Sequence, residues 1–383
     1  MSRPLTIPEA FADLQDPRVE RTRDHALLDI VFIALCALLC GANSFCAMET
    51  WARAKEPWLR ERLALPHGIP SHDTFNRVFA RLDPEQFSAC FRRWTEGLRV
   101  ALAAEVLALD GKTVRHSFDR GSGQGPLHLV SAWATDQRLI LGQVAVAEKS
   151  NEITALPALL KLLDVSGCIV TIDAMGCQHA IARQIRAQGG EYVLSLKENQ
   201  GRLHADVKEF LEDAVAGKFP AVALHHHHTF DGEHGRQEHR DYWVTEEIEW
   251  LREQHGGERW EGLRSIVLVR RRRRAGGPGT RVSEENSYYI SSLPAADLAD
   301  AARLGHAIRS HWGIENQLHW VLDLAFREDE CRVRLDRAPT NLATLRHFAL
   351  NLLRQEKSTK LGLEQKRLRA GWDPAYLERL LGF

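Results

Sequence analysis

The sequence predicts an α/β protein in which an all-helical region precedes a mixed sheet. The first hundred residues have helical periodicity, whereas short β-branched apolar runs alternate with helical segments after Leu102. A chain of 383 residues is long enough for more than one domain, and a hydrophobic content of 44% is normal for a globular protein. We therefore expect a helical region followed by a sheet region with a large core.

Composition argues against several classes of protein. The formal net charge is −1, so any binding of nucleic acid must come from local patches. The seven cysteines form no CxxC pair, which argues against a zinc ribbon or a disulfide framework. The apolar run from Ile30 to Ala42 falls short of the roughly 20 residues that a membrane span needs, and no signal peptide is recognised at the N-terminus. We expect a cytoplasmic protein with no membrane partner.

The region up to about Val100 is typical of short helices joined by tight turns. Ser71 or Asp73 can cap one helix, and the Asp83–Pro84 pair ends it and begins another. Such a region could be a helix-turn-helix, or a helical bundle that only packs against the sheet region. In the first case, four basic side chains are candidates for phosphate contacts: Arg77, Arg81, Arg92 and Arg93.

Five strands are expected after Leu102. The first three are the runs VLALD, PLHLVSAWAT and LILGQVAVAE, with a polar turn between the last two. A helix, ITALPALLKLL, then leads to the strand CIVTID, and a helix through HAIARQIRAQ leads to the strand EYVLSL. Three antiparallel strands followed by alternating helices and strands describe a mixed sheet with helices on its faces, which is the ribonuclease-H-like arrangement.

Two of these strands end in an aspartate, Asp110 on the first and Asp173 on the fourth. These strands would be neighbours in the ribonuclease-H-like arrangement, so the two carboxylates would lie close together. A third acid, Glu315, shares a predicted helix face with His311 and His319. Three carboxylates make an all-oxygen site suited to Mg²⁺ or Mn²⁺. A zinc site of the two histidines and Glu315 is disfavoured, because the spacing is not HExxH.

An insertion is expected between Asp173 and Glu315, because 142 residues separate them. Strand-like pieces place a β-rich insertion at about 219–293, and it contains three tryptophans: Trp243, Trp250 and Trp260. Its histidine tract, His225 to His228, is expected to be a polar loop and not a metal site. Its arginine run, Arg270 to Arg274, either binds a phosphate backbone or forms a solvated loop at a hairpin tip.

Several motifs, taken in order, resemble a known family. They are IPSHDTFNRVF, LALDGKTVR, HLVSAWA, EKSNEITALPALL, VTIDAMGCQ, YVLSLKENQ, HGRQEHR and HWGIENQLHWVLDLAFREDECR. The chain resembles the DDE insertion-sequence transposases, in the branch that includes the H-repeat-associated proteins. The resemblance spans nearly the whole chain and implies three parts: an N-terminal helical transposase-associated domain at 1–100, a DDE catalytic domain at 101–355 and a helical tail at 356–383.

The resemblance implies a DNA transposase that binds the ends of an insertion sequence and catalyses cut-and-paste transposition. Asp110, Asp173 and Glu315 would be the catalytic and metal-binding residues, with Asp110 bridging two Mg²⁺ or Mn²⁺ ions. The ions would activate a water or a DNA 3′-hydroxyl and stabilise the leaving oxygen. Double-stranded DNA, at the transposon ends and at the target, would be the partner of a homodimer. No covalent protein–DNA intermediate is required.

Six further side chains are expected to contact DNA: Lys112, Lys197, Arg236, Arg309, His311 and His319. The chain also departs from many relatives, which carry Tyr and Arg before the catalytic glutamate and Lys seven residues after it. The corresponding residues here are Ile308, His311 and Leu322. Arg309 and His319 are the candidates for the missing polar contacts. For Lys112 and Lys197, an ordinary surface charge is the competing interpretation.

Two other functions stay open at this point. A transposase-derived protein that binds DNA but no longer cuts it would keep the same fold. A divalent-metal nuclease would cleave DNA without joining the ends to a target. The presence of all three carboxylates favours a catalytic protein.

Overall fold

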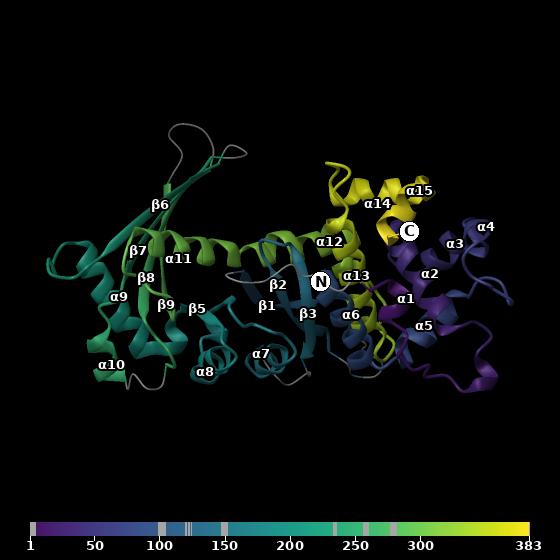
Figure 1. Cartoon of the computed structure of the whole chain (residues 1–383), viewed down its shortest axis with the longest axis horizontal. Coiled ribbons are helices and arrows are strands. Elements are labelled where there is room, and N and C mark those ends of the chain that lie inside the picture. Colours follow the sequence, from purple (N-terminus) through teal and green to yellow (C-terminus); the bar gives the residue numbers. More distant parts are fainter. Residues whose placement is uncertain are drawn as a thin grey trace. The chain divides into compact units, whose positions relative to one another are not determined.

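The computed structural model describes residues 5–98, 105–118, 121, 123, 125–146, 152–232, 236–255, 260–275 and 282–382 (Figure 1). The chain divides into two compact units. Unit 1 comprises Met1–Ala101, Gly111–Asn151 and Glu315–Phe383, and unit 2 comprises Leu102–Asp110 and Glu152–Ile314. The helices expected as a separate tail at 356–383 therefore share unit 1 with the N-terminal helices.

Unit 2 contains most of a mixed sheet, with the strand order β1-β4-β5-β9-β8-β7-β6. The strands are β1 (Val106–Val114), β4 (Ile169–Ile172), β5 (Glu191–Leu196), β6 (His225–Asp231), β7 (Arg236–Thr245), β8 (Ser265–Ala275) and β9 (Val282–Ser291). The first three are parallel, and β9 joins β5 in antiparallel pairing. The predicted β-rich insertion thus extends the central sheet, because its strands satisfy the hydrogen bonds at the β5 edge.

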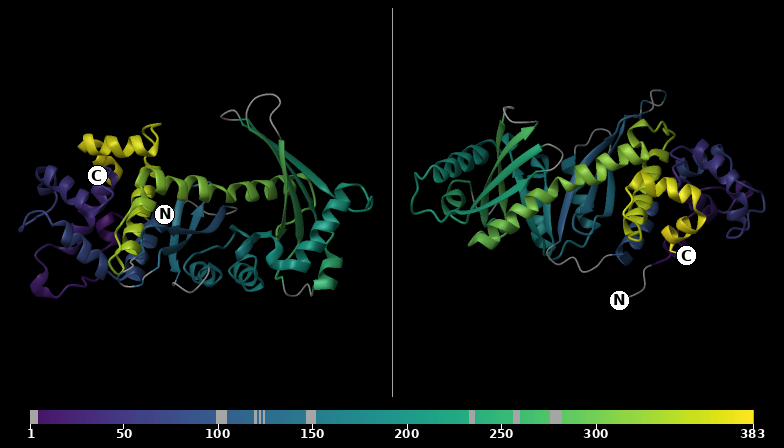
Figure 2. Two further views of the ribbon diagram at one scale, coloured as in Figure 1. Left: turned by 180° about the vertical axis from the view of Figure 1, so that it is seen from behind. Right: turned by 90° about the horizontal axis from the view of Figure 1, so that it is seen from above.

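A long helix covers one face of this sheet. The helices of unit 2 are α7 (Glu152–Lys161), α8 (His179–Ala187), α9 (Gly201–Val215), α10 (Glu249–His255) and α11 (Leu298–His311). Figure 2 shows α11, in light green, lying across the strands. The apolar side of α11 packs on strand residues that include Val106, Ile169 and Val244. Gly305 lets α11 approach the sheet closely, because a Cβ there would lie 3.2 Å from the His227 ring. The helix is therefore held against both the parallel and the antiparallel strands.

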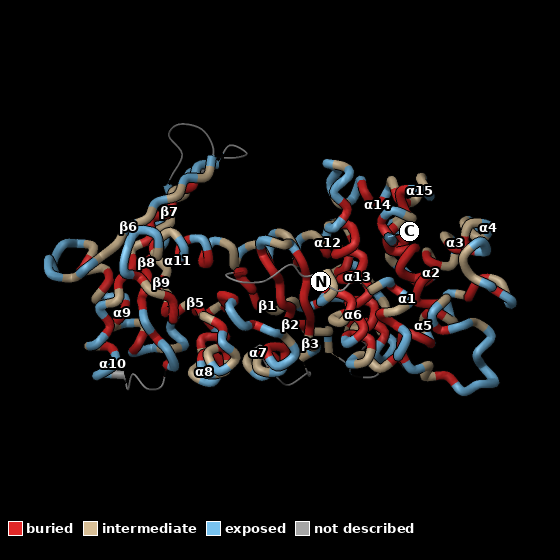
Figure 3. Tube along the Cα trace, viewed as in Figure 1, coloured by how far each residue is buried: buried red, intermediate tan, exposed pale blue. Residues whose placement is uncertain are grey.

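Helices from both ends of the chain build unit 1. They are α1 (Ile7–Ala10), α2 (Leu27–Leu39), α3 (Phe45–Ala54), α4 (Glu56–Arg60), α5 (His72–Arg81), α6 (Pro84–Leu98), α12 (Trp320–Phe326), α13 (Ala338–Gln355), α14 (Leu363–Trp372) and α15 (Pro374–Leu381). Buried residues dominate α2 and α13 (Figure 3). Phe348 of α13 stacks on Trp94 with ring centroids 4.4 Å apart, and on Phe11 at 5.1 Å. The N-terminal helices are thus packed around α13, and the apolar run from Ile30 is a core helix.

Unit 1 also holds a β-hairpin formed by β2 (Leu127–Ala134) and β3 (Leu139–Val146), in antiparallel pairing. Strand β2 is the neighbour of β1 in the sheet, and the residues of β1 from Gly111 onward belong to unit 1. The side chain of Asn351 in α13 hydrogen-bonds both the amide and the carbonyl of Ile140, which ties α13 to the hairpin. The ribonuclease-H-like mixed sheet with flanking helices, predicted from the sequence, is confirmed.

Two predictions within the insertion were wrong. The histidine tract is strand β6 and not a loop, because it pairs with β7, with His226 opposite Trp243. The arginine run lies within β8 and not at a hairpin tip. Acidic and amide side chains of neighbouring strands partner its first three arginines, Arg270 to Arg272, as in the 2.7 Å pair of Arg272 with Asp241. Cross-strand pairing thus overrides the polar character of both segments.

Two of the four basic residues proposed for phosphate contacts have partners inside unit 1. Arg93 donates to Asp13 at 2.6 Å, and Arg92 donates to the Ser88 hydroxyl at 3.2 Å. Arg77 and Arg81 are exposed on α5, whose N-terminus is capped by Ser71 as predicted.

Among the residues described, no helix is both long and apolar enough to cross a bilayer.

Candidate active site

Two of the three candidate carboxylates come from neighbouring strands of unit 2. Asp110 directly follows Leu109 in β1, and Asp173 directly follows Ile172 at the end of β4. Leu109 is paired with Ile172 in parallel register, so the two aspartates follow a matched pair at the same edge of the sheet. The predicted adjacency of the first and fourth strands is therefore confirmed. Both aspartates are half-buried.

A tight turn fixes the orientation of Asp173. Its Oδ1 accepts hydrogen bonds from the amides of Met175 at 3.0 Å and Gly176 at 3.3 Å. The turn requires glycine at 176, because a Cβ there would lie 2.1 Å from Cγ2 of Ile172. The backbone thus holds one carboxylate oxygen of Asp173 in place by two N–H donors.

His311, the last residue of α11, lies against the end of β4. Its Nδ1 is 3.1 Å from the hydroxyl of Thr171, two residues before Asp173. Burial lowers the pKa of His311 to about 4, although the charge of Asp173 acts in the opposite direction. His311 is therefore neutral at pH 7 and docks α11 on the sheet. Nδ1 of His311 is occupied by the contact with Thr171, and the DNA contact expected of this residue stays a prediction.

Glu315 follows His311 by four residues and belongs to unit 1. It lies in the π-helical stretch Ile314–His319, and its side chain is exposed. Single π-helical turns within helices are frequent at functional sites. The predicted row of His311, Glu315 and His319 thus runs from the end of α11 into this π-helical stretch. His319 is half-buried in this stretch.

The candidate ligands for a divalent metal in unit 2 are the carboxylates of Asp110 and Asp173. In the described ranges, no group of three or more His, Cys, Asp or Glu side chains is arranged to hold an ion. Asp110 and Asp173 nevertheless present carboxylates at adjacent strand ends, and one oxygen of Asp173 is held by the turn. Carboxylate oxygens are the donors that Mg²⁺ and Mn²⁺ prefer, so this pair fits such an ion chemically.

Lys112 does not have the role expected for it. Its ammonium is ion-paired with three carboxylates of unit 1: Asp323 at 2.6 Å, Glu328 at 3.0 Å and Asp329 at 3.5 Å. Only 10% of its side chain is exposed. Burial alone would lower the pKa of Lys112, but Glu328 and Asp323 raise it. Lys112 is thus a buried internal cation and not a free contact for phosphate. Sequence reasoning missed its partners, although the acidic run FREDE was a signal.

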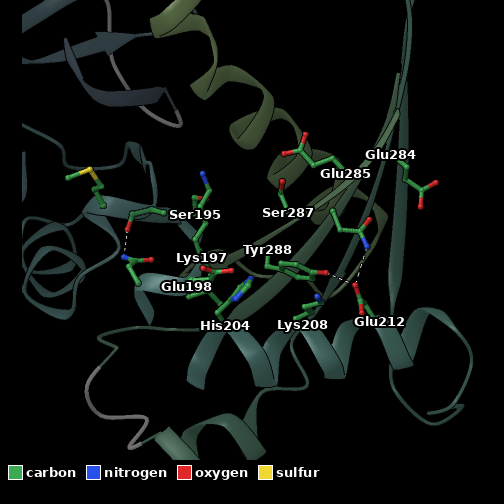
Figure 4. A pocket seen from close by; sticks show the side chains of 15 residues that line it. Ser195, Lys197, Glu198, His204, Lys208, Glu212, Glu284, Glu285, Ser287 and Tyr288 are labelled. Carbon is green, nitrogen blue, oxygen red and sulfur yellow. Dashed lines mark hydrogen bonds between the residues drawn. The ribbon is translucent and has the colours of Figure 1, made fainter. Parts of the chain in front are cut away.

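Unit 2 contains a cavity of about 720 Å³ (Figure 4). Ala174 and Met175, the two residues that follow Asp173 in the sequence, line it together with residues after β5, on α9 and on β9. Lys197, a predicted DNA contact, lines the cavity and is exposed. On the opposite wall, Tyr288 donates a 2.6 Å hydrogen bond to Glu212, which lowers the pKa of Glu212. This Tyr288–Glu212 pair was not predictable from the sequence, because the two residues lie on different elements.

The remaining candidates lie on the surface of unit 2. Arg236 is exposed at the start of β7, and Arg309 is exposed on α11, where it pairs with Asp231 at 3.3 Å. The three tryptophans of the insertion differ in exposure. Trp260 is only 2% exposed and packs on His179, Trp243 stacks on His226, and Trp250 donates to the carbonyl of Glu247. Trp260 is therefore the least accessible of the three.

Comparison with known proteins identifies the family. A sequence model described as "Transposase DDE domain" matches residues 102–352, which include Asp110, Asp173 and Glu315, and a DDE transposase-associated model matches residues 8–95. The chain belongs to the DDE transposase family. The matched ranges of this DDE transposase cover both the helical region and the sheet.

Curated relatives of this DDE transposase match over nearly its full length. The "H repeat-associated putative transposase YhhI" of Escherichia coli K12 is 37% identical, over 97% of each chain. The protein YbfL of the same strain is also 37% identical, over 97% of each chain. A protein from the 3′ region of dhlA in Xanthobacter autotrophicus is 46% identical, over 76% of this chain and 96% of its own.

Among solved structures, the chain is similar to a piggyBac transposase in a synaptic complex with hairpin DNA. The TM-score is 0.42 and the identity 10%, over 98% of this chain and 76% of that one. This likeness is distant, and the family assignment does not depend on it.

Proposed function

We propose that this DDE transposase binds the ends of an insertion sequence and catalyses metal-dependent strand cleavage and strand transfer, in cut-and-paste transposition. One observation carries the proposal: Asp110 and Asp173 occupy matched ends of adjacent parallel strands. Glu315 follows His311 by four residues in the sequence. The family match adds support, because it covers all three acids.

In this proposal, Asp110, Asp173 and Glu315 hold two Mg²⁺ or Mn²⁺ ions. When bound, such ions supply activation of a water or a DNA 3′-hydroxyl and stabilisation of the leaving oxygen. The turn at Gly176 orients Asp173, because its two amides fix one carboxylate oxygen. His311, being neutral, adds no positive charge that would compete for Asp173.

The proposed partner is double-stranded DNA, at the transposon ends and at the target, bound by a homodimer in the cytoplasm. Lys197, Arg236 and Arg309 are exposed and remain our candidates for phosphate contacts in unit 2. Asp231 does not neutralise Arg309 strongly, because both side chains are more than 40% exposed and solvent screens the pair. His319 remains a candidate beside Glu315.

Strand transfer is the step that separates this function from its alternatives. The substrate is a pre-cut terminal-repeat duplex of the element that encodes the chain, mixed with a supercoiled target plasmid and Mg²⁺. We expect plasmid products joined to the duplex 3′-end for the parent chain, and none for Asp173→Asn. Cleavage of an uncut end without joined products would instead indicate a nuclease. Specific binding with neither reaction would indicate a DNA-binding descendant.

A further inference from the structure

A groove in unit 1 contains none of the candidate catalytic or DNA-contact residues named for the active site. It has a volume of about 720 Å³. One wall is made by the start of α3 (residues 43–47) and by His72 and Asn76 of α5, and the other by seven residues of the segment from Arg327 to Leu335. We call it the arginine groove, because Arg327, Arg332 and Arg334 line it.

The arginine groove is positively charged in a chain whose formal net charge is −1. Among its described lining residues, Glu330 is the one carboxylate against three guanidinium groups. Glu330 pairs with Arg327 at 3.8 Å, but the two side chains are 70% and 68% exposed. Such an exposed pair contributes little and leaves Arg327 available to another anion. A concave surface of one sign of charge concentrates ligands of the opposite sign.

The three arginines differ in how they are held. Arg332 is exposed and makes no ion pair with any residue that the structure describes. Arg334 donates from Nε to the carbonyl of His116 at 3.0 Å, and its guanidinium lies 4.7 Å from the ring centre of Phe118. These two contacts fix Arg334 in the wall of the groove. Arg332 is thus a free cation beside a fixed one.

The backbone at Arg327 points to a role for its side chain. Arg327 ends α12 with φ 49° and ψ 44°, in the left-handed region. This conformation is unfavourable for a residue other than glycine, and glycine is the usual residue at such a helix end. The chain carries an arginine at a position where glycine would be more stable. Its side chain offsets that cost if it binds an anion.

Two helices add to the positive potential. Both α3 and α5 begin at the groove, and each has ten residues. Their N-terminal ends carry partial positive charge from the aligned peptide dipoles. Ser44 and Ser71 each accept from one amide of their helix. The Glu49 carboxylate accepts from the His72 amide at 2.7 Å, which offsets the positive potential at the start of α5, so α3 contributes the larger potential. The arginines remain the groups that would donate hydrogen bonds.

We infer that the arginine groove binds the phosphate backbone of duplex DNA. The planar guanidinium group matches phosphate geometry, and several cations on one wall suit a chain of phosphates. This inference rests on the proposed function, which supplies DNA as the partner. It adds a contact surface formed by the N-terminal helices together with the segment that follows α12.

The salt dependence of DNA binding tests the inference. The Arg327→Gln/Arg332→Gln variant removes the two exposed cations and spares Arg334, which has internal contacts. The slope of log K against log salt is negative, and each lost phosphate contact reduces its magnitude by about 0.9. We therefore expect the magnitude of the slope to fall by about 1.8. Arg21→Gln/Arg183→Gln is the matched control, because it removes the same charge from exposed positions outside the groove. An unchanged slope in the groove variant, or an equal loss in the control, would overturn the inference.

Two cysteines provide a second readout that does not depend on activity. Cys46 is exposed, Cys331 is half-buried, and both line the groove. With bound duplex DNA, we expect alkylation of Cys46 by iodoacetamide to slow at least several-fold, measured by mass spectrometry. Equal alkylation with and without bound DNA would reject the groove while leaving the proposed function intact. Failure of the parent chain to bind any duplex would reject both.

Discussion

The buried cation Lys112 allows a quantitative prediction about stability. Replacing it with Met removes the charge that meets Asp323, Glu328 and Asp329. Glu328 is 1% exposed and would keep only Arg346, at 3.4 Å. Removing one partner of a buried ion pair costs about 3 to 5 kcal/mol, because the remaining charge is uncompensated. For a unit of roughly 200 residues, that lowers Tm by about 6 to 20 °C.

Thermal unfolding followed by circular dichroism measures this change. Lys357→Met is the matched control, because Lys357 is an exposed lysine of the same unit and its replacement should leave Tm nearly unchanged. Adding Glu328→Gln to Lys112→Met should not restore the loss, because it takes from the buried Arg346 its ion-pair partner Glu328. If Lys112→Met melted within about 2 °C of the parent, the charge cluster would not stabilise unit 1 as reasoned here.

The pH dependence of this cluster follows from the directions of the two pKa shifts. Burial opposes ionisation of Glu328, yet Lys112 and Arg346 lower its pKa. Its contribution to the free energy of unfolding is therefore fully present above the unfolded pKa of about 4.5 and is lost as the pH falls below that value. Lys112 has a raised pKa, so its contribution is present below about 10.5 and is lost at higher pH. The Tm difference between the parent and Lys112→Met should therefore be largest between these limits.

Two further predictions concern the neighbourhood of Asp173. Gly176→Ala should lower DNA cleavage at least tenfold while DNA binding is retained, because the new Cβ would collide with Ile172 and displace the turn that holds Asp173; full cleavage would show that the turn is not required. The imidazole of His311 should stay neutral down to about pH 5 in a nitrogen-15 NMR titration, because burial lowers its pKa to about 4. Protonation near pH 6.5 would show that the ring is exposed to water.

The sheet was predictable because its signals are local. An apolar, β-branched run that ends in an aspartate identifies both the strand and the acid, as at Asp110 and Asp173. The order of the first five strands follows from hairpin and crossover connections. The helix pattern of the first hundred residues was equally clear, since Ser71 caps α5 as expected. These features need no knowledge of distant contacts.

The features that sequence reasoning missed depend on distant partners. Lys112 meets carboxylates more than 200 residues away, so its spacing from Asp110 could not show that it is buried. The histidine tract has weak strand preference and becomes a strand only by pairing with β7. The π-helix at Glu315 is defined by hydrogen bonds between residues five apart, and a sequence pattern of four-residue spacing cannot reveal it.

The proposed metal-dependent cleavage is tested most directly on a duplex that carries the terminal repeat of the element. The parent chain would be compared with Asp110→Asn, which removes one negative charge with little change in shape, in Mg²⁺ and then in Mn²⁺. We expect cleavage at the repeat end by the parent alone, with equal DNA binding by both chains. Cleavage by Asp110→Asn at the parent rate would contradict the assignment of Asp110. Binding without cleavage by the folded parent would contradict the proposed catalysis.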